Sequence, residues 1–322
     1  MNQIIEDEKY MRRCLQLAAN GRNNAKPNPM VGAVIVCDRR IIGEGYHVRC
    51  GEGHAEVNAF KSVNDEDGKL LTKSTMYVSL EPCSHYGRTP PCADLIVSKK
   101  IRRVVVGCVD PFAKVQGRGI QKLRDAGIDV TVGVLERECL ELNKRFITYN
   151  THHRPYVILK WAQSANGFLD DNFKATLFSN SFTKMLVHKL RAESDAIIVG
   201  RINNERDHPQ LNVREWSGDN PMRIVLDRNH PFCTDADFDS PVLPQLMRYL
   251  YDKGIQSLLV EGGAYTHNSF IESGLWDEIR VEKTKKAVRK GTKSAQIPDD
   301  AILTEEKVYD DNTISIYHRD ID

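Results

Sequence analysis

Long apolar runs are missing from this sequence of 322 residues. No stretch approaches the roughly 18 apolar residues that a transmembrane helix requires, so we expect no membrane span and no membrane partner. The opening residues, MNQIIEDEKYMRRCLQLAAN, interrupt their apolar positions with charges and lack the apolar core of a signal peptide. The sequence therefore predicts a cytoplasmic protein.

An excess of charge of one sign is missing as well. The formal net charge is +1, so no broad basic surface is expected. Arginine pairs occur at 12–13 and 39–40, but there is no dense basic run of the kind that holds a nucleic acid. We expect no nucleic-acid partner.

Internal repeats and low-complexity segments are also absent, and the composition, 41% hydrophobic and 28% charged, is typical of globular proteins. A chain of 322 residues predicts two domains and can bury a core without disulfides. The sequence has eight cysteines, and only Cys233 lies after residue 140. In a cytosolic chain, such a cluster of cysteines indicates metal binding or catalysis more often than disulfides.

Strand and helix patterns alternate along the first half of the chain, which predicts a layered α/β domain with a largely parallel sheet. The expected strands are 30–36, 74–80, 102–109 and 128–134, and the expected helices are 6–20, 54–63, 92–100 and 120–127.

The pattern breaks at TYNTHHRP, residues 148–155, and a second α/β series follows. Its expected strands are 156–163, 195–200, 223–227, 257–263 and 313–319, and its expected helices are 181–194 and 244–254. We therefore expect two domains, residues 1–147 and 154–322.

The stretch GHAEVNAF, residues 53–60, is followed by EPCSHYGRTPPC, residues 81–92. His54, Cys83 and Cys92 are the ligand types that zinc prefers, and a catalytic zinc site keeps three protein ligands and leaves the fourth position for water. Glu56 lies two residues from the histidine, where a carboxylate can serve as a proton shuttle. The spacing therefore predicts a catalytic Zn²⁺ site with Glu56 as its general acid and base.

The combination H-x-E followed by P-C and a second cysteine is the pattern of zinc-dependent deaminases. The usual gap between the two cysteines is two residues, whereas eight separate Cys83 from Cys92. A structural zinc site with His85 as fourth ligand is the alternative, and it would leave Glu56 without a purpose. The remaining cysteines have no ligand spacing, so we expect buried thiols at positions 14, 37, 50, 108, 139 and 233.

The longer gap, together with neighbouring motifs, resembles the deaminase half of the RibD family of bifunctional riboflavin-biosynthesis proteins. The segments that carry the resemblance are KPNPMVGAVIV, GYHVRCGEGHAEVNAF, PCSHYGRTPPC and GCVDPFAKVQGRGIQKLRDAGIDVTVGV, within residues 7–146. The resemblance implies a cytidine-deaminase-like fold and a small-molecule substrate, a phosphoribosylated diaminopyrimidine that loses its exocyclic amine. It also implies that Asn28 and His47 line the pocket for the base.

From residue 154 the chain resembles the reductase half of the same family, which has a dihydrofolate-reductase-like fold and uses NADPH to reduce the ribose to a ribityl chain. The segments are RPYVILKWAQSANG, HKLRAESDAIIVG, DHPQLNVR, RIVLD and LLVEGGAYTHNSFI. By motif position, the resemblance implies substrate contacts from Arg191, Leu211, Arg214 and Glu261. It implies cofactor contacts from Gln163, Asn203, Asp207, Gly262 and Gly263.

The residues themselves favour a phosphate site in this half. Gly262 and Gly263 stand between an expected strand and an expected helix, where backbone N–H groups at a helix start attract anions. The pattern is not G-x-G-x-x-G, so a Rossmann fold is not indicated. Arg214 suits the substrate phosphate because a guanidinium can donate two hydrogen bonds at once.

This half departs from the family pattern at four positions: Asn166 stands where Asp is usual, Arg201 and Asn203 where Thr is usual, and Leu177 where Trp is often found.

Four functions are compatible with the sequence at this stage. They are a bifunctional enzyme, a deaminase with a degenerate reductase half, a deaminase of nucleic-acid bases, and a zinc-stabilised binding protein without catalysis. The family resemblance favours the first and further implies a homo-oligomer.

Overall fold

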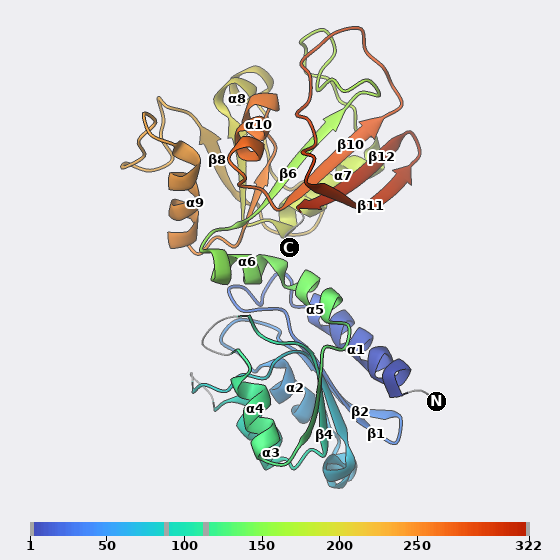
Figure 1. Ribbon diagram of the computed structural model, residues 1–322. Helices are drawn as coiled ribbons and strands as arrows, with labels where there is room; N and C mark the ends of the chain where they lie inside the picture. The colour runs from blue at the N-terminus through green and yellow to red at the C-terminus, as the bar shows by residue number, and fades with distance from the viewer. Residues whose placement is uncertain (1–2, 87–89, 112–115, 320–322) are drawn as a thin grey trace. The chain divides into compact units, whose positions relative to one another are not determined.

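The computed structural model describes residues 3–86, 90–111 and 116–319. The chain divides into two compact units, Met1–Thr151 and His152–Asp322 (Figure 1). Within the described ranges, no helix combines the length and the apolar character needed to cross a bilayer.

The first unit alternates strands and helices over most of its length, as the sequence predicts. Its strands are β1 (Gly32–Cys37), β2 (Arg40–Tyr46), β3 (Thr75–Leu80), β4 (Arg103–Cys108) and β5 (Asp129–Val132). Its helices are α1 (Gln3–Ala19), α2 (Ala55–Lys61), α3 (Cys92–Ser98), α4 (Arg118–Asp125), α5 (Glu136–Leu142) and α6 (Lys144–His152), with a 3₁₀ segment, η1 (Asp65–Lys73).

The five strands of the first unit form one sheet in the order β2-β1-β3-β4-β5. The β3–β4 and β4–β5 pairs are parallel, but β1 pairs with both β2 and β3 in the antiparallel direction. The expectation of a largely parallel sheet is therefore wrong for this unit, which has a mixed sheet. No hairpin signal precedes β2, because the turn before it uses Asp38 and Arg39 at positive φ of 48° and 62° instead of the usual Asn-Gly.

Alternating side chains of the central strands build a core on each face of this sheet. Ala33, Ile35 and Cys37 pack on the side of α2, α3 and α4, whereas Val34 and Val36 pack against α1. Because side chains alternate along a strand, an uninterrupted apolar strand such as β1 serves both layers. The unit is thus a three-layer α/β domain.

The described residues of the second unit form seven strands and four further helices. The strands are β6 (Tyr156–Gln163), β7 (Ala196–Gly200), β8 (Met222–Leu226), β9 (Ser257–Val260), β10 (Glu278–Thr284), β11 (Ala301–Tyr309) and β12 (Asn312–Arg319). The helices are α7 (Ser181–Glu193), α8 (Arg201–Asp207), α9 (Val242–Asp252) and α10 (Ala264–Glu272).

The sheet of the second unit has the order β11-β12-β10-β6-β9-β7-β8. It is parallel from β10 to β8 and antiparallel at the β12 and β11 edge. Leu190 of α7 packs on one face with Ile158 and Ile197, and Leu246 of α9 and Phe270 of α10 pack on the other. Strand ends at the centre of this sheet therefore lie between two helical layers.

The expected break near residues 148–155 is helical in the structure up to His152, where α6 ends. The division of the two activities at this boundary remains a prediction.

Candidate functional sites

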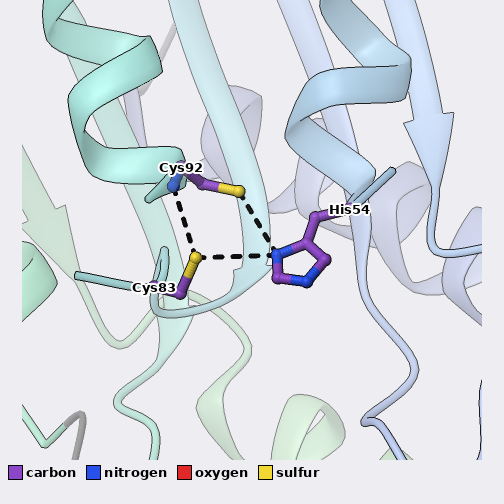
Figure 2. A group of neighbouring side chains, drawn as sticks. All are labelled: His54, Cys83 and Cys92. Carbon is purple, nitrogen blue, oxygen red and sulfur yellow. Dashed lines mark hydrogen bonds between the residues drawn. The ribbon is translucent and has the colours of Figure 1, made fainter. Parts of the chain in front are cut away.

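Three side chains of the first unit converge on one point (Figure 2). The Nδ1 atom of His54 lies 3.6 Å from the Sγ atom of Cys83 and 3.4 Å from that of Cys92. All three ligand atoms lie within 4.8 Å of one another, and no fourth histidine, cysteine or carboxylate of the described residues joins them. His85, the alternative ligand, is exposed.

Two helix starts hold this cluster in place. His54 is the residue before α2, and Cys92 is the first residue of α3, as the sequence predicts. The backbone N–H of Cys92 donates to the Sγ atom of Cys83 at 3.3 Å, and the N–H of Ala93 donates to the carbonyl of Cys83 at 3.1 Å. The turn carrying Cys83 is thereby bonded to the start of α3.

The cluster fits a tetrahedral zinc ion. With Zn–S near 2.3 Å, Zn–N near 2.05 Å and a tetrahedral angle, nitrogen and sulfur should be about 3.5 Å apart. The observed separations of 3.6 and 3.4 Å bracket that value. Hydrogen bonds from the Cys92 thiol lower the pKa of Cys83, as do contacts with His54, so the site already favours a thiolate.

Glu56 lies in the first turn of α2 and is 3% exposed. Burial, with the nearby Cys83 thiolate, raises the pKa of its carboxyl group to about 7. A carboxyl group with a pKa near neutrality can both accept and release a proton under working conditions.

Asn28 and His47 meet beside the cluster. The Nδ2 atom of Asn28 lies 3.1 Å from the Nε2 atom of His47, and the Nδ1 atom of His47 lies 3.2 Å from the carbonyl of Gly53. A neutral ring protonated at Nδ1 satisfies both contacts. Burial lowers the pKa of His47 and so favours that neutral form. The rings of His47 and His54 pack edge to face at 5.4 Å, so these two predicted base contacts lie close to the metal ligands.

Two supporting residues near the cluster carry no recognisable sequence signal. Asn58 donates to the carbonyls of Tyr46 and Gly53, which fixes the turn before His54. Glu81 is buried, and its carboxylate accepts four backbone N–H groups, those of Asp110, Gly117, Gly119 and Ile120. Glu81 thereby joins the strand before Cys83 to the start of α4.

The expectation of buried thiols is confirmed at positions 14, 37, 108 and 139 and is wrong at two others. Cys50 is exposed and Cys233 is only partly buried. Both lie in polar loop segments outside the strands and helices, where no core is available to cover them.

The second unit has a pocket of about 410 Å³ where β7 and β9 lead into α8 and α10. It is lined by Asn203 and Gly263 of the predicted cofactor set, and also by Arg201, Arg206 and the first turn of α10. The helix start suits an anionic ligand, whereas both arginines are already paired, Arg201 with Glu205 and Arg206 with Asp170.

The two glycines at this turn differ in their surroundings. A Cβ atom at Gly262 would lie 2.7 Å from the Cβ atom of Thr266, whereas one at Gly263 would meet nothing within 4 Å. Gly262 is therefore required by packing within the unit, and Gly263 borders open space in the pocket.

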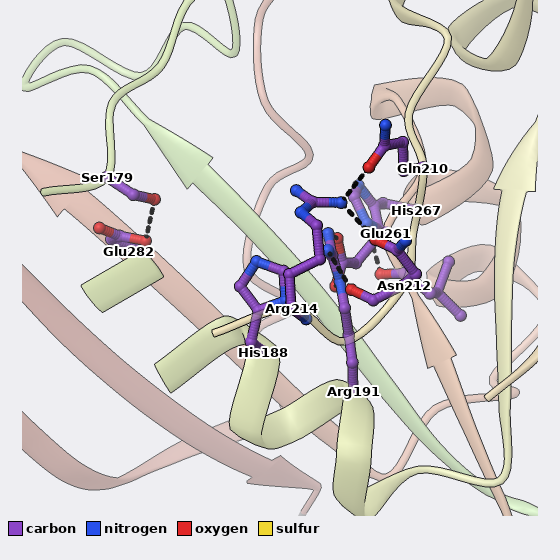
Figure 3. Close-up of polar contacts among 10 residues, drawn as sticks. Ser179, His188, Arg191, Gln210, Asn212, Arg214, Glu261, His267 and Glu282 are labelled. Atoms are coloured by element: carbon purple, nitrogen blue, oxygen red, sulfur yellow. Dashed lines mark hydrogen bonds and ion pairs between the residues drawn. The ribbon is translucent and has the colours of Figure 1, made fainter. Parts of the chain in front are cut away.

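Arg191 and Glu261, both predicted to contact substrate, bind one another (Figure 3). The guanidinium donates to the two carboxylate oxygens at 2.9 and 2.6 Å, and the side chains are only 12% and 11% exposed. Burial alone would raise the pKa of Glu261, but the hydrogen bonds from Arg191 hold it below its ordinary value. This geometry makes the pair a bridge between α7 and the end of β9.

Arg214 differs from Arg191 because its side chain is exposed and donates to the amide side chains of Gln210 and Asn212 (Figure 3). No ion pair joins it to an acidic group of the described residues. The side chain of Leu211 is buried in the core with Leu190 and Val199, so only its backbone could face a ligand.

The other predicted cofactor residues make local contacts. Gln163 accepts a hydrogen bond from the indole N–H of Trp161 at 2.8 Å, and Asp207 pairs with Arg206 at 3.2 Å.

Asn166, one of the departures from the family pattern, accepts from Ser164 and from the N–H of Val288, and donates to the carbonyl of Val288 at 2.8 Å. An aspartate could not make that last bond, which gives a structural reason for Asn166.

Comparison with known proteins agrees with these two sites. Residues 4–108 match the family model of the cytidine and deoxycytidylate deaminase zinc-binding region. Residues 155–283 match the model of the RibD C-terminal domain. The fold and the sites thus define a zinc-binding deaminase domain followed by a reductase domain.

Full-length relatives narrow the class. The chain is 37% identical to the riboflavin biosynthesis protein RibD of Aquifex aeolicus, with 88% of each chain covered, and 35% identical to that of Escherichia coli, with 86% and 87% covered. It also resembles the crystal structure of a diaminohydroxyphosphoribosylaminopyrimidine deaminase/5-amino-6-(5-phosphoribosylamino)uracil reductase from Thermotoga maritima. That similarity has 32% identity and a TM-score of 0.88, with 99% of this chain and 100% of the other covered.

The chain belongs to the RibD family. It is a bifunctional enzyme of riboflavin biosynthesis, with a zinc-dependent deaminase domain and an NADPH-dependent reductase domain. The sequence expectations of family, of fold class and of both cofactors are confirmed. Because the chain belongs to this family, the bifunctional enzyme is favoured over a nucleic-acid base deaminase and over a binding protein.

Proposed function

We propose that the first unit removes the exocyclic amine of 2,5-diamino-6-(phosphoribosylamino)pyrimidinone by hydrolysis, and that the second unit then reduces the ribose of the product to a ribityl chain. The observation that carries this proposal is the cluster of His54, Cys83 and Cys92 next to the buried carboxyl group of Glu56. The diaminohydroxyphosphoribosylaminopyrimidine deaminase activity of the Thermotoga maritima relative supplies the substrate class.

In the deaminase, zinc bound by the three ligands would polarise a water molecule and lower its pKa. Glu56 takes a proton from the attacking water and delivers it to the amine nitrogen, which leaves as ammonia. Asn28 and His47 hold the base, with His47 kept neutral by burial and by its bond to the Gly53 carbonyl. Asn28 keeps its side-chain oxygen available for the pyrimidine edge.

In the reductase, NADPH supplies the hydride. The pocket at the start of α10 suits the cofactor, because Gly263 leaves it open and the first turn of α10, whose backbone N–H groups favour an anion, lines it. Arg214 binds the substrate phosphate, since its guanidinium has no acidic partner in the described part of the chain and can donate two bonds at once. The division between the two activities falls near residues 148–154.

We further propose that the protein works in the cytoplasm on a small-molecule substrate and forms a homo-oligomer. Size-exclusion chromatography with light scattering tests the last point, and a mass of one chain at working concentration would contradict it.

The test of the two-step function uses the diaminopyrimidine substrate with and without NADPH. The wild-type protein should release ammonia without NADPH and should oxidise NADPH only after deamination. Glu56→Gln should slow ammonia release by about 10²–10⁴-fold, because a general acid and base contributes that much, and should retain zinc. The same variant should reduce pre-deaminated substrate at the normal rate.

Each failure points to a different error. Near-normal ammonia release from Glu56→Gln would show that Glu56 does not transfer the proton. If wild-type protein deaminates but shows no saturable NADPH binding, the second unit is a degenerate reductase.

A further inference from the structure

The segment that carries Arg214 is held by two residues of one helix (Figure 3). His188 of α7 accepts the backbone N–H of Arg214 on its Nδ1 atom at 3.1 Å. Arg191, one turn further along the same face of α7, donates to the backbone carbonyl of Asn212 at 3.2 Å. The backbone of residues 212–214 is therefore tied to α7 at two points, while the Arg214 side chain stays exposed.

The two ties differ in how they are stabilised. Arg191 is fixed by its two hydrogen bonds to Glu261, so its position does not depend on the segment it holds. His188 is 1% exposed, and its ring also lies against the backbone of Asn212. His188 opens the segment HKLRAESDAIIVG, but the sequence assigned it no role, because a histidine on a helix face is usually a core residue.

The bond from Arg214 requires a lone pair on Nδ1 of His188, so the ring must carry its proton on Nε2. Burial lowers the pKa of His188, and the positive charges of Arg191 and Arg214 lower it further. Glu215 acts in the opposite direction, but it is paired with Lys184 at 2.5 Å. The surroundings thus favour the neutral ring that can accept the bond.

Protonation would replace that acceptor with a donor facing another N–H group, beside two arginines. The native bond is therefore present above the ordinary histidine value of 6.5 and is lost as the pH falls through the lower value of the folded protein. The segment should then detach from α7 on the side of Arg214.

We propose that His188 is a positioning residue of the reductase, which fixes the backbone of Arg214 so that its guanidinium is presented to the phosphate of the substrate. This inference rests on the proposed function of the second unit. His188 touches neither substrate nor cofactor; it acts through Arg214 alone.

The experiment measures the KM and kcat for the deaminated substrate and the Kd of NADPH, for the full-length wild-type protein and for His188→Ala, Arg214→Ala and the double variant. His188→Ala should raise KM about five- to tenfold, the range expected for one hydrogen bond, and leave kcat and the Kd of NADPH unchanged. In the double variant, His188→Ala should add nothing to the effect of Arg214→Ala, since the two residues act in series.

His188→Asn is the matched control, because its side-chain oxygen can accept from the Arg214 N–H but never titrates. It should restore the wild-type KM at about pH 8, well above the histidine value. As the pH is lowered from 6.5, the wild-type KM should rise above that of His188→Asn, and titration of the substrate phosphate cancels because both proteins meet the same substrate.

The outcomes separate the inference from the function on which it rests. If the wild type fails to reduce the substrate, or Arg214→Ala leaves KM unchanged, the proposed phosphate site is wrong. If Arg214→Ala raises KM while His188→Ala does not, or the two effects add fully, His188 has no positioning role. A loss of NADPH affinity in both His188 variants would show a purely structural role and would also overturn the inference.

Discussion

The two candidate sites are built in different ways. In the first unit, His54, Cys83 and Cys92 converge without a fourth ligand from the described residues, and a metal ion completes the set. In the second unit, two residues expected to contact substrate, Arg191 and Glu261, already satisfy one another. A metal site is thus recognisable as a cluster, whereas the proposed substrate-phosphate site of the second unit rests on one exposed arginine, Arg214, next to the buried Arg191–Glu261 pair.

This difference explains why the metal site of the first unit is easier to predict from the sequence than the ligand sites of the second unit. Zinc demands particular atoms at fixed separations, so few residue types can serve. A phosphate or a cofactor can be held by many combinations of backbone and side-chain donors. Three experiments test the comparison.

The largest effect is expected from Cys83→Ser. Removing one of three ligands should release most of the zinc and abolish deamination, because the weaker oxygen ligand cannot replace the thiolate. Metal analysis and ammonia release check this result. Cys50→Ser is the control, since that exposed cysteine lies outside the cluster and should retain one zinc per chain.

The affinity of the same Cys83→Ser protein for NADPH should equal that of the wild type. A parallel loss of zinc and of NADPH binding would mean that the two units do not work independently. Full zinc retention would show that Cys83 is not a ligand.

A smaller effect is expected from the two glycines of the second unit. Gly262→Ala should destabilise this unit by about 1–3 kcal/mol, because its Cβ atom would overlap Thr266. Gly263→Ala should leave stability unchanged but weaken NADPH binding, because its Cβ atom enters the pocket. Thermal unfolding and NADPH titration measure the two effects.

Each glycine variant is the control for the other. Equal loss of stability in both would place Gly263 in the core and not at the pocket. Unchanged NADPH affinity in Gly263→Ala would show that the cofactor does not bind at the start of α10.

The smallest effect is expected from Asn166→Asp, which introduces the residue usual in the family. The change removes the bond donated to the Val288 carbonyl, so a loss of about 0.5–1 kcal/mol is expected at this exposed position. NADPH affinity should not change, because both sides of the Asn166 amide serve the neighbouring backbone. A tighter Kd for NADPH in the variant would instead show that Asn166 impairs cofactor binding.

The sequence predicted the strands and helices of both units well wherever apolar residues follow a clear period. β1, for example, is apolar throughout and serves two cores. It failed at β2, whose glycines and charges hide a strand, and at β11, an edge strand with mostly exposed residues. It also failed at β10, a central strand in which charged residues alternate with Ile279 and Val281. Edge strands bury few side chains, so their sequences carry little pattern.

The geometry of the metal cluster followed from local sequence, because His54 and Cys92 each stand at a helix start. The contacts of Glu81, Asn58 and His188 could not be foreseen. Each binds backbone atoms, which leave no trace in the identity of the partner residue. Such contacts depend on how distant segments meet in the folded chain.

The bonds that close the turn between Cys83 and Cys92 also bear on how this family could diversify. The Cys92 and Ala93 N–H groups fix the two ends of the turn to each other, and Glu81 anchors its entry. The number of residues between Cys83 and Cys92 can then change at little cost in free energy. Growth from the usual two residues to eight is two doublings of loop length, which costs only about 1.2 kcal/mol in closure entropy. The metal centre therefore depends on the bonded ends of this segment and hardly on the number of residues between its two cysteines.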